Sequence, residues 1–153
     1  MNVNQSIIIS VMKKISTLIA FIVCCMMAFG QGVHFEDLTL DEALAKAKAE
    51  NKLVFMDCYT SWCGPCKWMA TEIFPQKEAG DYFNPKFISV KYDMEKGEGL
   101  KLKDKYKPSG YPTFFIIRPD GTVQHAVVGG GELEPFIERV KKGLNEKTSL
   151  LYL

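Results

Sequence analysis

The sequence predicts an α/β protein whose central mixed sheet is covered by helices on both faces. Three observations support this fold class. Short apolar runs typical of strands alternate with amphipathic stretches, two consecutive strands late in the chain flank a turn, and an amphipathic stretch closes the chain. With 153 residues, 47% of them apolar and 24% charged, the chain has the size and composition of one globular domain.

In the first part of the domain, predicted helices and strands alternate. Residues 40–51 are rich in alanine and lysine and predict an amphipathic helix. The apolar run 53–58 predicts a buried strand. A helix is expected from residue 63 to about residue 74, where Pro75 ends or kinks it, and residues 76–84 can form a second helical segment.

The second part of the domain contains the remaining strands, ending in a hairpin and a helix. Alternation, turn residues and helical periodicity locate the elements: a strand at 86–94, a loop at 95–99, a short helix ending near Tyr106, strands at 113–118 and 122–128 around a turn at 119–121, and a helix at 132–147. The resulting order α-β-α-β-α-β-β-α indicates the mixed sheet.

The N-terminal segment predicts export. Lys13 and Lys14 precede an uncharged apolar stretch, residues 15–29, which ends in small residues before Gln31. This stretch is shorter than the ~20 residues that a membrane-spanning helix needs. We therefore expect a secretory signal peptide at residues 1–30, with residues 1–11 as an upstream extension or an early start codon, and one folded domain at 31–153. An uncleaved membrane anchor is the alternative.

Cysteine usage agrees with a periplasmic or otherwise extracytoplasmic location. Cys24 and Cys25 lie in the signal segment, and Val23 before Cys24 argues against a lipid-attachment site. The mature chain would keep Cys58, Cys63 and Cys66, an odd number in a compartment where disulfides persist. The net charge of +1 argues against nucleic acid as a partner.

A cysteine pair follows the first buried strand. Cys63 and Cys66 are separated by Gly64 and Pro65 at the expected start of a helix, where free N–H groups and the helix dipole stabilise a thiolate. Pro65 suits the first helical turn. The competing interpretations are a structural disulfide or half of a zinc site, which would need further ligands.

These residues resemble the thioredoxin superfamily over about residues 38–144. The segment from Trp62 to Lys67, WCGPCK, is the full active-site segment of thioredoxins, and Tyr111-Pro112-Thr113 follows at a distance. The resemblance implies a thioredoxin fold, a redox-active Cys63–Cys66 disulfide, and a cis peptide bond before Pro112. Cys63 would be the nucleophile and Cys66 the resolving cysteine in thiol–disulfide exchange.

The resemblance also implies roles for neighbouring residues. Asp57 matches a buried aspartate that relays protons to Cys66, and Lys91 matches its lysine partner; a plain salt bridge between them is the alternative. An apolar surface that receives the client protein would be formed by Trp62, Gly64, Pro65, Tyr111 and Pro112. Tyr111 would lend backbone groups to an extended client segment.

Three positions depart from the family pattern. Thr71 replaces the proline that usually kinks the active-site helix, so the bend must come from elsewhere, such as Pro75. Residues 95–99 enlarge a loop, which bears on the choice of partner. Cys58 stands where an aromatic residue is common; it should point to the sheet face opposite Asp57 as a small buried hydrophobe, with redox sensing as the alternative.

Three functional hypotheses follow. The first is an enzyme, a protein-disulfide reductase acting on disulfide-containing client proteins and supplied with electrons by a membrane donor, which the Gly64-Pro65 pair favours. The second is an oxidase or isomerase on the same fold, and the third is a binding module with silent cysteines. No cofactor and no metal are expected, and we expect a monomer.

Overall fold

The computed structural model describes Met12 and residues 32–144. The chain divides into two compact units, residues 1–30 and 31–153, and the second contains the fold described below. Apart from Met12, the predicted signal peptide lies outside the described residues, as do residues 145–147 of the predicted last helix. Within the described part, no helix is long and apolar enough to cross a membrane.

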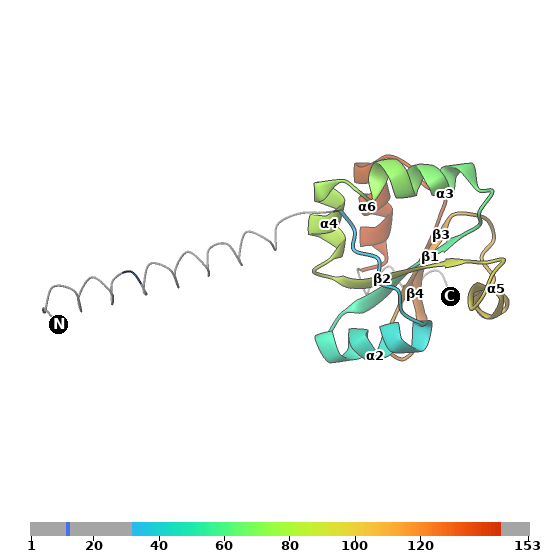
Figure 1. The fold of residues 1–153 in the computed structure, drawn as a ribbon, viewed down its shortest axis with the longest axis horizontal. Coiled ribbons are helices and arrows are strands. Elements are labelled where there is room, and N and C mark those ends of the chain that lie inside the picture. The colour runs from blue at the N-terminus through green and yellow to red at the C-terminus, as the bar shows by residue number, and fades with distance from the viewer. Residues whose placement is uncertain (1–11, 13–31, 145–153) are drawn as a thin grey trace, which may run out of the picture. The chain divides into compact units, whose positions relative to one another are not determined.

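The predicted elements occur in the predicted order, with ends that differ by a few residues (Figure 1). They are α2 (Leu40–Glu50), β1 (Leu53–Tyr59), α3 (Gly64–Trp68), the π-helix η1 (Met69–Ile73), α4 (Lys77–Phe83), β2 (Phe87–Asp93), α5 (Gly99–Tyr106), β3 (Thr113–Ile117), β4 (Val123–Val128) and α6 (Leu133–Lys142).

The four strands form one mixed sheet in the order β2-β1-β3-β4. β1 pairs parallel to β2, which requires the crossover through α3 and α4, and antiparallel to β3. β3 and β4 form the predicted antiparallel hairpin. The central strands β1 and β3 are buried, as expected for apolar runs covered on both faces, so the predicted α/β fold class is confirmed.

Each face of the sheet has its own apolar core. On one face, η1, α4 and α6 cover an aromatic cluster that includes Phe55, Phe83, Phe114 and Phe136. On the other face, α2 and α5 cover Val54, Met56, Cys58 and other apolar side chains. Figure 1 shows α2 on one side of the sheet and α3, α4 and α6 on the other. Alternation along β1 therefore assigns consecutive residues to different cores.

The active-site helix changes its hydrogen-bonding pattern in the middle. The α-helical turns of α3 continue into η1, where the Phe74 N–H donates to the Met69 carbonyl at 2.9 Å, five residues back. Thr71, at the usual proline position, lies within η1, and its hydroxyl donates to the Lys67 carbonyl at 3.1 Å. At the position of the family's proline, the helix thus has a π-helical turn, which ends two residues before Pro75.

Sequence patterns did not predict an additional backbone pairing at the sheet edge. Phe35 forms a parallel bridge with Ser89 of β2, and the Glu36 N–H donates to the Ser89 carbonyl at 2.8 Å. A single bridge involves too few residues to produce a period-2 pattern. This segment covers the outer edge of β2.

Candidate active site

Cys63 and Cys66 form a disulfide at the start of α3, with a Cα–Cα distance of 5.3 Å. Cys63 is the N-cap residue of α3, and its sulfur accepts a hydrogen bond from the Cys66 N–H at 3.1 Å. Pro65 occupies the first turn, as predicted, where no N–H is required. When the pair is reduced, the same N–H and the helix N-terminus would stabilise negative charge on Cys63.

Trp62 lies on the surface beside this pair, with 65% of its side chain exposed. Its indole N–H donates to a carboxylate oxygen of Glu95 at 3.0 Å. Its ring also meets the ring of Tyr111 edge to face, with centroids 6.1 Å apart. Two residues from separate loops, Glu95 and Tyr111, therefore contact this large exposed side chain. Glu95 is a site residue that the sequence analysis missed.

The segment before β3 meets the cysteine segment through this ring contact. The Tyr111–Pro112 peptide bond is cis. The Pro112 carbonyl accepts a hydrogen bond from the Gly129 N–H at 2.8 Å, and the Thr113 hydroxyl donates to the Gly110 carbonyl at 2.7 Å. Tyr111 is half-buried, whereas Pro112 is buried. The structure thus places the Trp62 and Tyr111 segments, which are distant in sequence, side by side.

Asp57 is a buried carboxyl near the end of β1. Burial raises its pKa from its ordinary value of 3.8 to about 7, although the positive charge of Lys91 acts in the opposite direction. Among the described residues its Oδ1 atom has no hydrogen-bond partner, and neither has the buried hydroxyl of Thr60. A buried carboxyl with such a pKa can exchange a proton near neutral pH.

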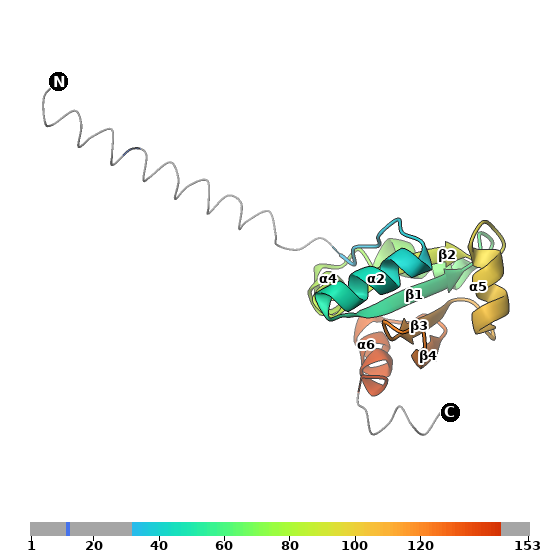
Figure 2. The same ribbon diagram turned by 90° about the horizontal axis from the view of Figure 1, so that it is seen from below.

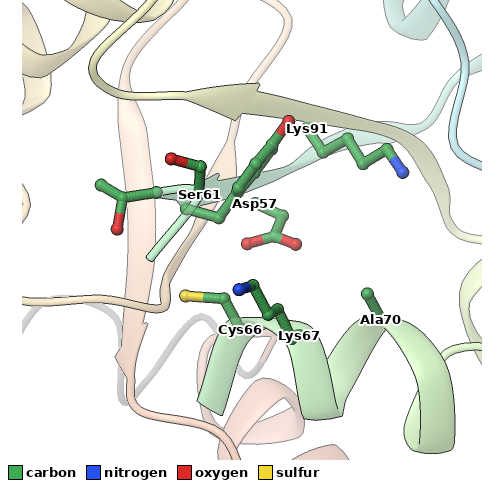
Figure 3. A pocket seen from close by; sticks show the side chains of 8 residues that line it. Asp57, Ser61, Cys66, Lys67, Ala70 and Lys91 are labelled. Carbon is green, nitrogen blue, oxygen red and sulfur yellow. The ribbon is translucent and has the colours of Figure 1, made fainter. Parts of the chain in front are cut away.

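Both unpaired groups belong to residues that line a pocket of about 190 Å³ shared with Cys66 (Figure 3). Its lining residues are Asp57, Tyr59, Thr60, Ser61, Cys66, Lys67, Ala70 and Lys91. A pocket of this volume with several polar groups has room for hydrogen-bonded water. Asp57 and Cys66 thus line the same pocket.

Lys91 is the cross-strand neighbour of Asp57 in the β1–β2 register. Its side chain extends away from the carboxyl in Figure 3, and its ammonium group lies 5.6 Å from the centroid of the Phe35 ring. No ion pair within 4.0 Å joins the two residues in the described part of the chain. Lys91 therefore influences Asp57 through its electric field, without the direct salt bridge that we considered.

Cys58 lies on the other face of β1, as predicted from strand alternation. It is a free, buried cysteine in the core cluster under α2 and α5. Burial, and secondarily the negative charge of Asp57, raise the pKa of its thiol well above the ordinary range. The thiol is therefore held in its unreactive protonated form.

Comparisons with known proteins agree with this fold and site. The sequence profile of a family described as Thioredoxin-like matches residues 35–119. Thioredoxin-1 of Drosophila melanogaster is 36% identical over 70 residues, which cover 46% of this chain and 61% of that protein. The chain thus spans less than two thirds of the length of this curated relative.

Two solved structures cover more of the chain. The solution structure of a candidate disulphide-isomerase from Bacteroides thetaiotaomicron is 42% identical with a TM-score of 0.68, covering 77% of this chain and 98% of that one. The oxidised C-terminal domain of DsbD from Neisseria meningitidis is 25% identical with a TM-score of 0.58, covering 72% and 98% respectively.

The fold and the cysteine pair are those of a thiol–disulfide oxidoreductase. Because the family match spans more than half of the 153 residues, the chain belongs to the thioredoxin-like family.

Proposed function

We propose that the protein is an exported protein-disulfide reductase that acts through Cys63 and Cys66. The observation that carries this proposal is the Cys63–Cys66 disulfide at a helix N-terminus, next to an exposed Trp62 that is held in place by two neighbours. A structural disulfide would not need an exposed aromatic platform beside it. An exposed aromatic side chain is, however, typical of a surface that binds another polypeptide.

Cys63 is the nucleophile of the proposed reaction. As a thiolate it attacks one sulfur of the client disulfide, forming a mixed disulfide while the other client sulfur leaves as a thiolate. Cys66 then attacks the Cys63 sulfur, which restores the internal disulfide and releases the second client thiolate. The client gains two electrons, the chain loses two, and the client thiolates take up protons from their surroundings.

Asp57 is the proposed proton acceptor for Cys66. Cys66 must lose its thiol proton before it can attack. Like Cys63, of which 4% is exposed, Cys66 is buried, with 6% of the residue exposed. The carboxyl in the shared pocket can accept that proton directly or through water, because its pKa of about 7 allows both protonation states at neutral pH. Lys91 tunes this carboxyl by its charge.

The client segment is proposed to bind across Trp62, Gly64, Pro65, Tyr111 and Pro112. Gly64 and Pro65 are exposed beside the disulfide, and Tyr111 contacts Trp62. An extended segment could pair with the backbone at Tyr111, where β3 has not yet begun. Backbone pairing requires no particular client side chain, so it suits an enzyme with many clients.

The reducing direction requires a continuing supply of electrons. In the exported, periplasmic location that residues 1–30 predict, the surroundings favour disulfides. We therefore propose a membrane protein as electron donor, which would reduce the Cys63–Cys66 disulfide by the same exchange chemistry. The chain is proposed to act as a monomer whose signal peptide is removed.

Disulfide oxidation or isomerisation is the second candidate, because the same residues serve both directions and one similar structure is a candidate disulphide-isomerase. The reduction potential separates the two. The purified chain would be equilibrated in thiol–disulfide buffers, and the oxidation state of the Cys63–Cys66 pair followed by alkylation and peptide mass mapping. A reduction potential of about −270 mV, typical of thioredoxin, supports the reductase. A potential of about −180 to −120 mV favours an isomerase or oxidase.

A serine substitution distinguishes catalysis from simple binding. Cys66→Ser should trap mixed disulfides between Cys63 and client proteins, and Cys63→Ser should abolish both trapping and reductase activity. A binding module with silent cysteines would retain its cellular role in Cys63→Ser. That outcome, or the lack of any reversible two-electron step at the pair, would overturn the proposed function.

A further inference from the structure

Three consecutive glycines, Gly129 to Gly131, connect β4 to α6. Gly129 and Gly131 have φ values of 82° and 150°, a region that other residues rarely adopt. Glycine also has the greatest backbone freedom of all residues. Without additional contacts, this triglycine loop would be one of the least ordered parts of the domain.

The triglycine loop nevertheless touches two parts of the active site. The Gly129 N–H donates to the carbonyl of Pro112, the cis-proline. Gly130 packs against the active-site helix so closely that a Cβ atom there would lie 2.9 Å from Cγ of Met69 and 3.8 Å from the carbonyl oxygen of Pro65. The loop therefore contacts both the cis-proline segment and the active-site helix.

Arg139 of α6 binds the start of this loop and the end of β4. Its guanidinium group donates to the carbonyls of Val128, Gly129 and Gly130 at 3.0, 3.1 and 2.7 Å. The guanidinium also lies 5.5 Å from the centroid of the Phe136 ring, which supports it from the same helix. α6 packs against β4, and Figure 2 shows the two elements close together.

We infer that Arg139 is a positioning residue for client binding. By holding three successive carbonyls, it fixes the triglycine loop as one wall of the client-binding surface and turns those carbonyls away from the client. The exposed side chain of Val128, which precedes the loop, is then available to contact the client. The inference rests on the proposed function, because it assigns the loop to the surface that receives the client.

The chemistry of the side chain explains why arginine serves here. Guanidinium has five N–H donors in a rigid plane, so one group can bond three carbonyls, whereas a lysine ammonium is a compact charge on a flexible stem. Hydrogen bonds from a charged donor are also stronger than neutral ones. Arg139→Lys should therefore restore the contact only in part.

Two measurements on the full chain test the inference. In hydrogen exchange, the amide of Gly129 should exchange faster in Arg139→Ala than in the wild type. With an insulin disulfide as substrate and dithiothreitol as reductant, KM should rise about 5- to 10-fold in Arg139→Ala, as expected for the loss of hydrogen bonds to a charged group. Turnover of a small aromatic disulfide, which needs no extended surface, should stay within about twofold.

Lys142→Ala is the matched control, since Lys142 is an exposed cation near the end of the same helix and makes none of these contacts. Arg139→Lys, which keeps the charge, should give intermediate KM and exchange values. Unchanged Gly129 exchange in Arg139→Ala, or an equal KM increase in Lys142→Ala, would overturn the positioning role. A wild-type chain that reduces neither disulfide would instead refute the proposed function, while the exchange result would still report on the loop.

Discussion

Asp57 and Cys58 are consecutive residues of β1 whose side chains lie in different environments on opposite faces of the sheet. Asp57 lines the pocket that it shares with Cys66, whereas Cys58 is buried among the apolar residues under α2 and α5. Alternation along the strand separates a proton-exchanging group from an inert thiol that is one residue away. The pH dependence of stability tests the Asp57 carboxyl, and alkylation tests the Cys58 thiol.

Replacing Asp57 should remove a pH dependence of stability. Because folding raises the Asp57 pKa from 3.8 to about 7, the folded state holds this proton more tightly than the unfolded state. Stability should therefore fall as pH rises from about 4 to above 7, by up to roughly 4 kcal/mol for this group. Asp57→Asn should flatten this part of the profile and be more stable than the wild type at pH 8, measured by denaturant unfolding of the oxidised protein.

Asp57→Asn should also slow the reaction step in which Cys66 attacks the mixed disulfide. Without the carboxyl, release of the mixed disulfide by Cys66 should slow about 10- to 100-fold near pH 7 and recover at higher pH, where the thiol ionises without help. Asp104→Asn, at an exposed position of α5, is the matched control and should alter neither profile. An Asp57→Asn variant with the wild-type stability profile would contradict the assignment.

Cys58 should resist alkylation in the folded, reduced protein. Its thiol is buried and its pKa is raised, so little thiolate is available to react. We expect iodoacetamide at pH 8 to modify the Cys63 peptide at least about 100-fold faster than the Cys58 peptide, as measured by mass spectrometry. Unfolding in guanidinium should make the two rates comparable. Rapid native labelling of Cys58 would revive the redox-sensing alternative.

Removing the Glu95 carboxylate should loosen Trp62. The loss of one hydrogen bond to a charged acceptor should raise KM for a protein disulfide about 2- to 5-fold in Glu95→Ala. Glu95→Gln keeps an acceptor oxygen and should have a smaller effect. Trp62 anisotropy, read in a Trp68→Phe background, should decrease in Glu95→Ala; unchanged anisotropy and KM would show that the Tyr111 contact alone is sufficient.

Truncating Phe55 should strongly destabilise the domain. Its ring stacks on Phe114 at 5.5 Å and lies 4.7 Å from the ring of Phe83, at the centre of the aromatic cluster. Phe55→Ala should lower the free energy of unfolding by about 3–5 kcal/mol. Leu100→Ala removes an exposed side chain and should change stability by less than about 0.5 kcal/mol. Urea unfolding of both variants provides the comparison.

Local patterns predicted most of the fold because they reflect local physics. The apolar runs at β1 and β3 indicated buried strands, and the turn residues after β3 indicated the hairpin. The cysteine pair could be recognised because its chemistry depends on a spacing of three residues within one helical turn. The π-helical segment at Met69–Ile73 could not be predicted, since nothing in its composition distinguishes it from a regular α-helix.

The sequence by itself determined the mixed α/β fold, the Cys63–Cys66 pair and the burial of Cys58, because each depends on spacing or alternation along a short stretch. The family resemblance also supplied Asp57, Lys91 and Tyr111 as neighbours of the pair. Only the tertiary structure decided how these residues contact one another and which further residues join them. Glu95 reaches Trp62 across 33 residues, Lys91 acts on Asp57 without an ion pair, and Arg139 holds the triglycine loop. Such contacts depend on how the elements pack in space, which local spacing and periodicity do not encode.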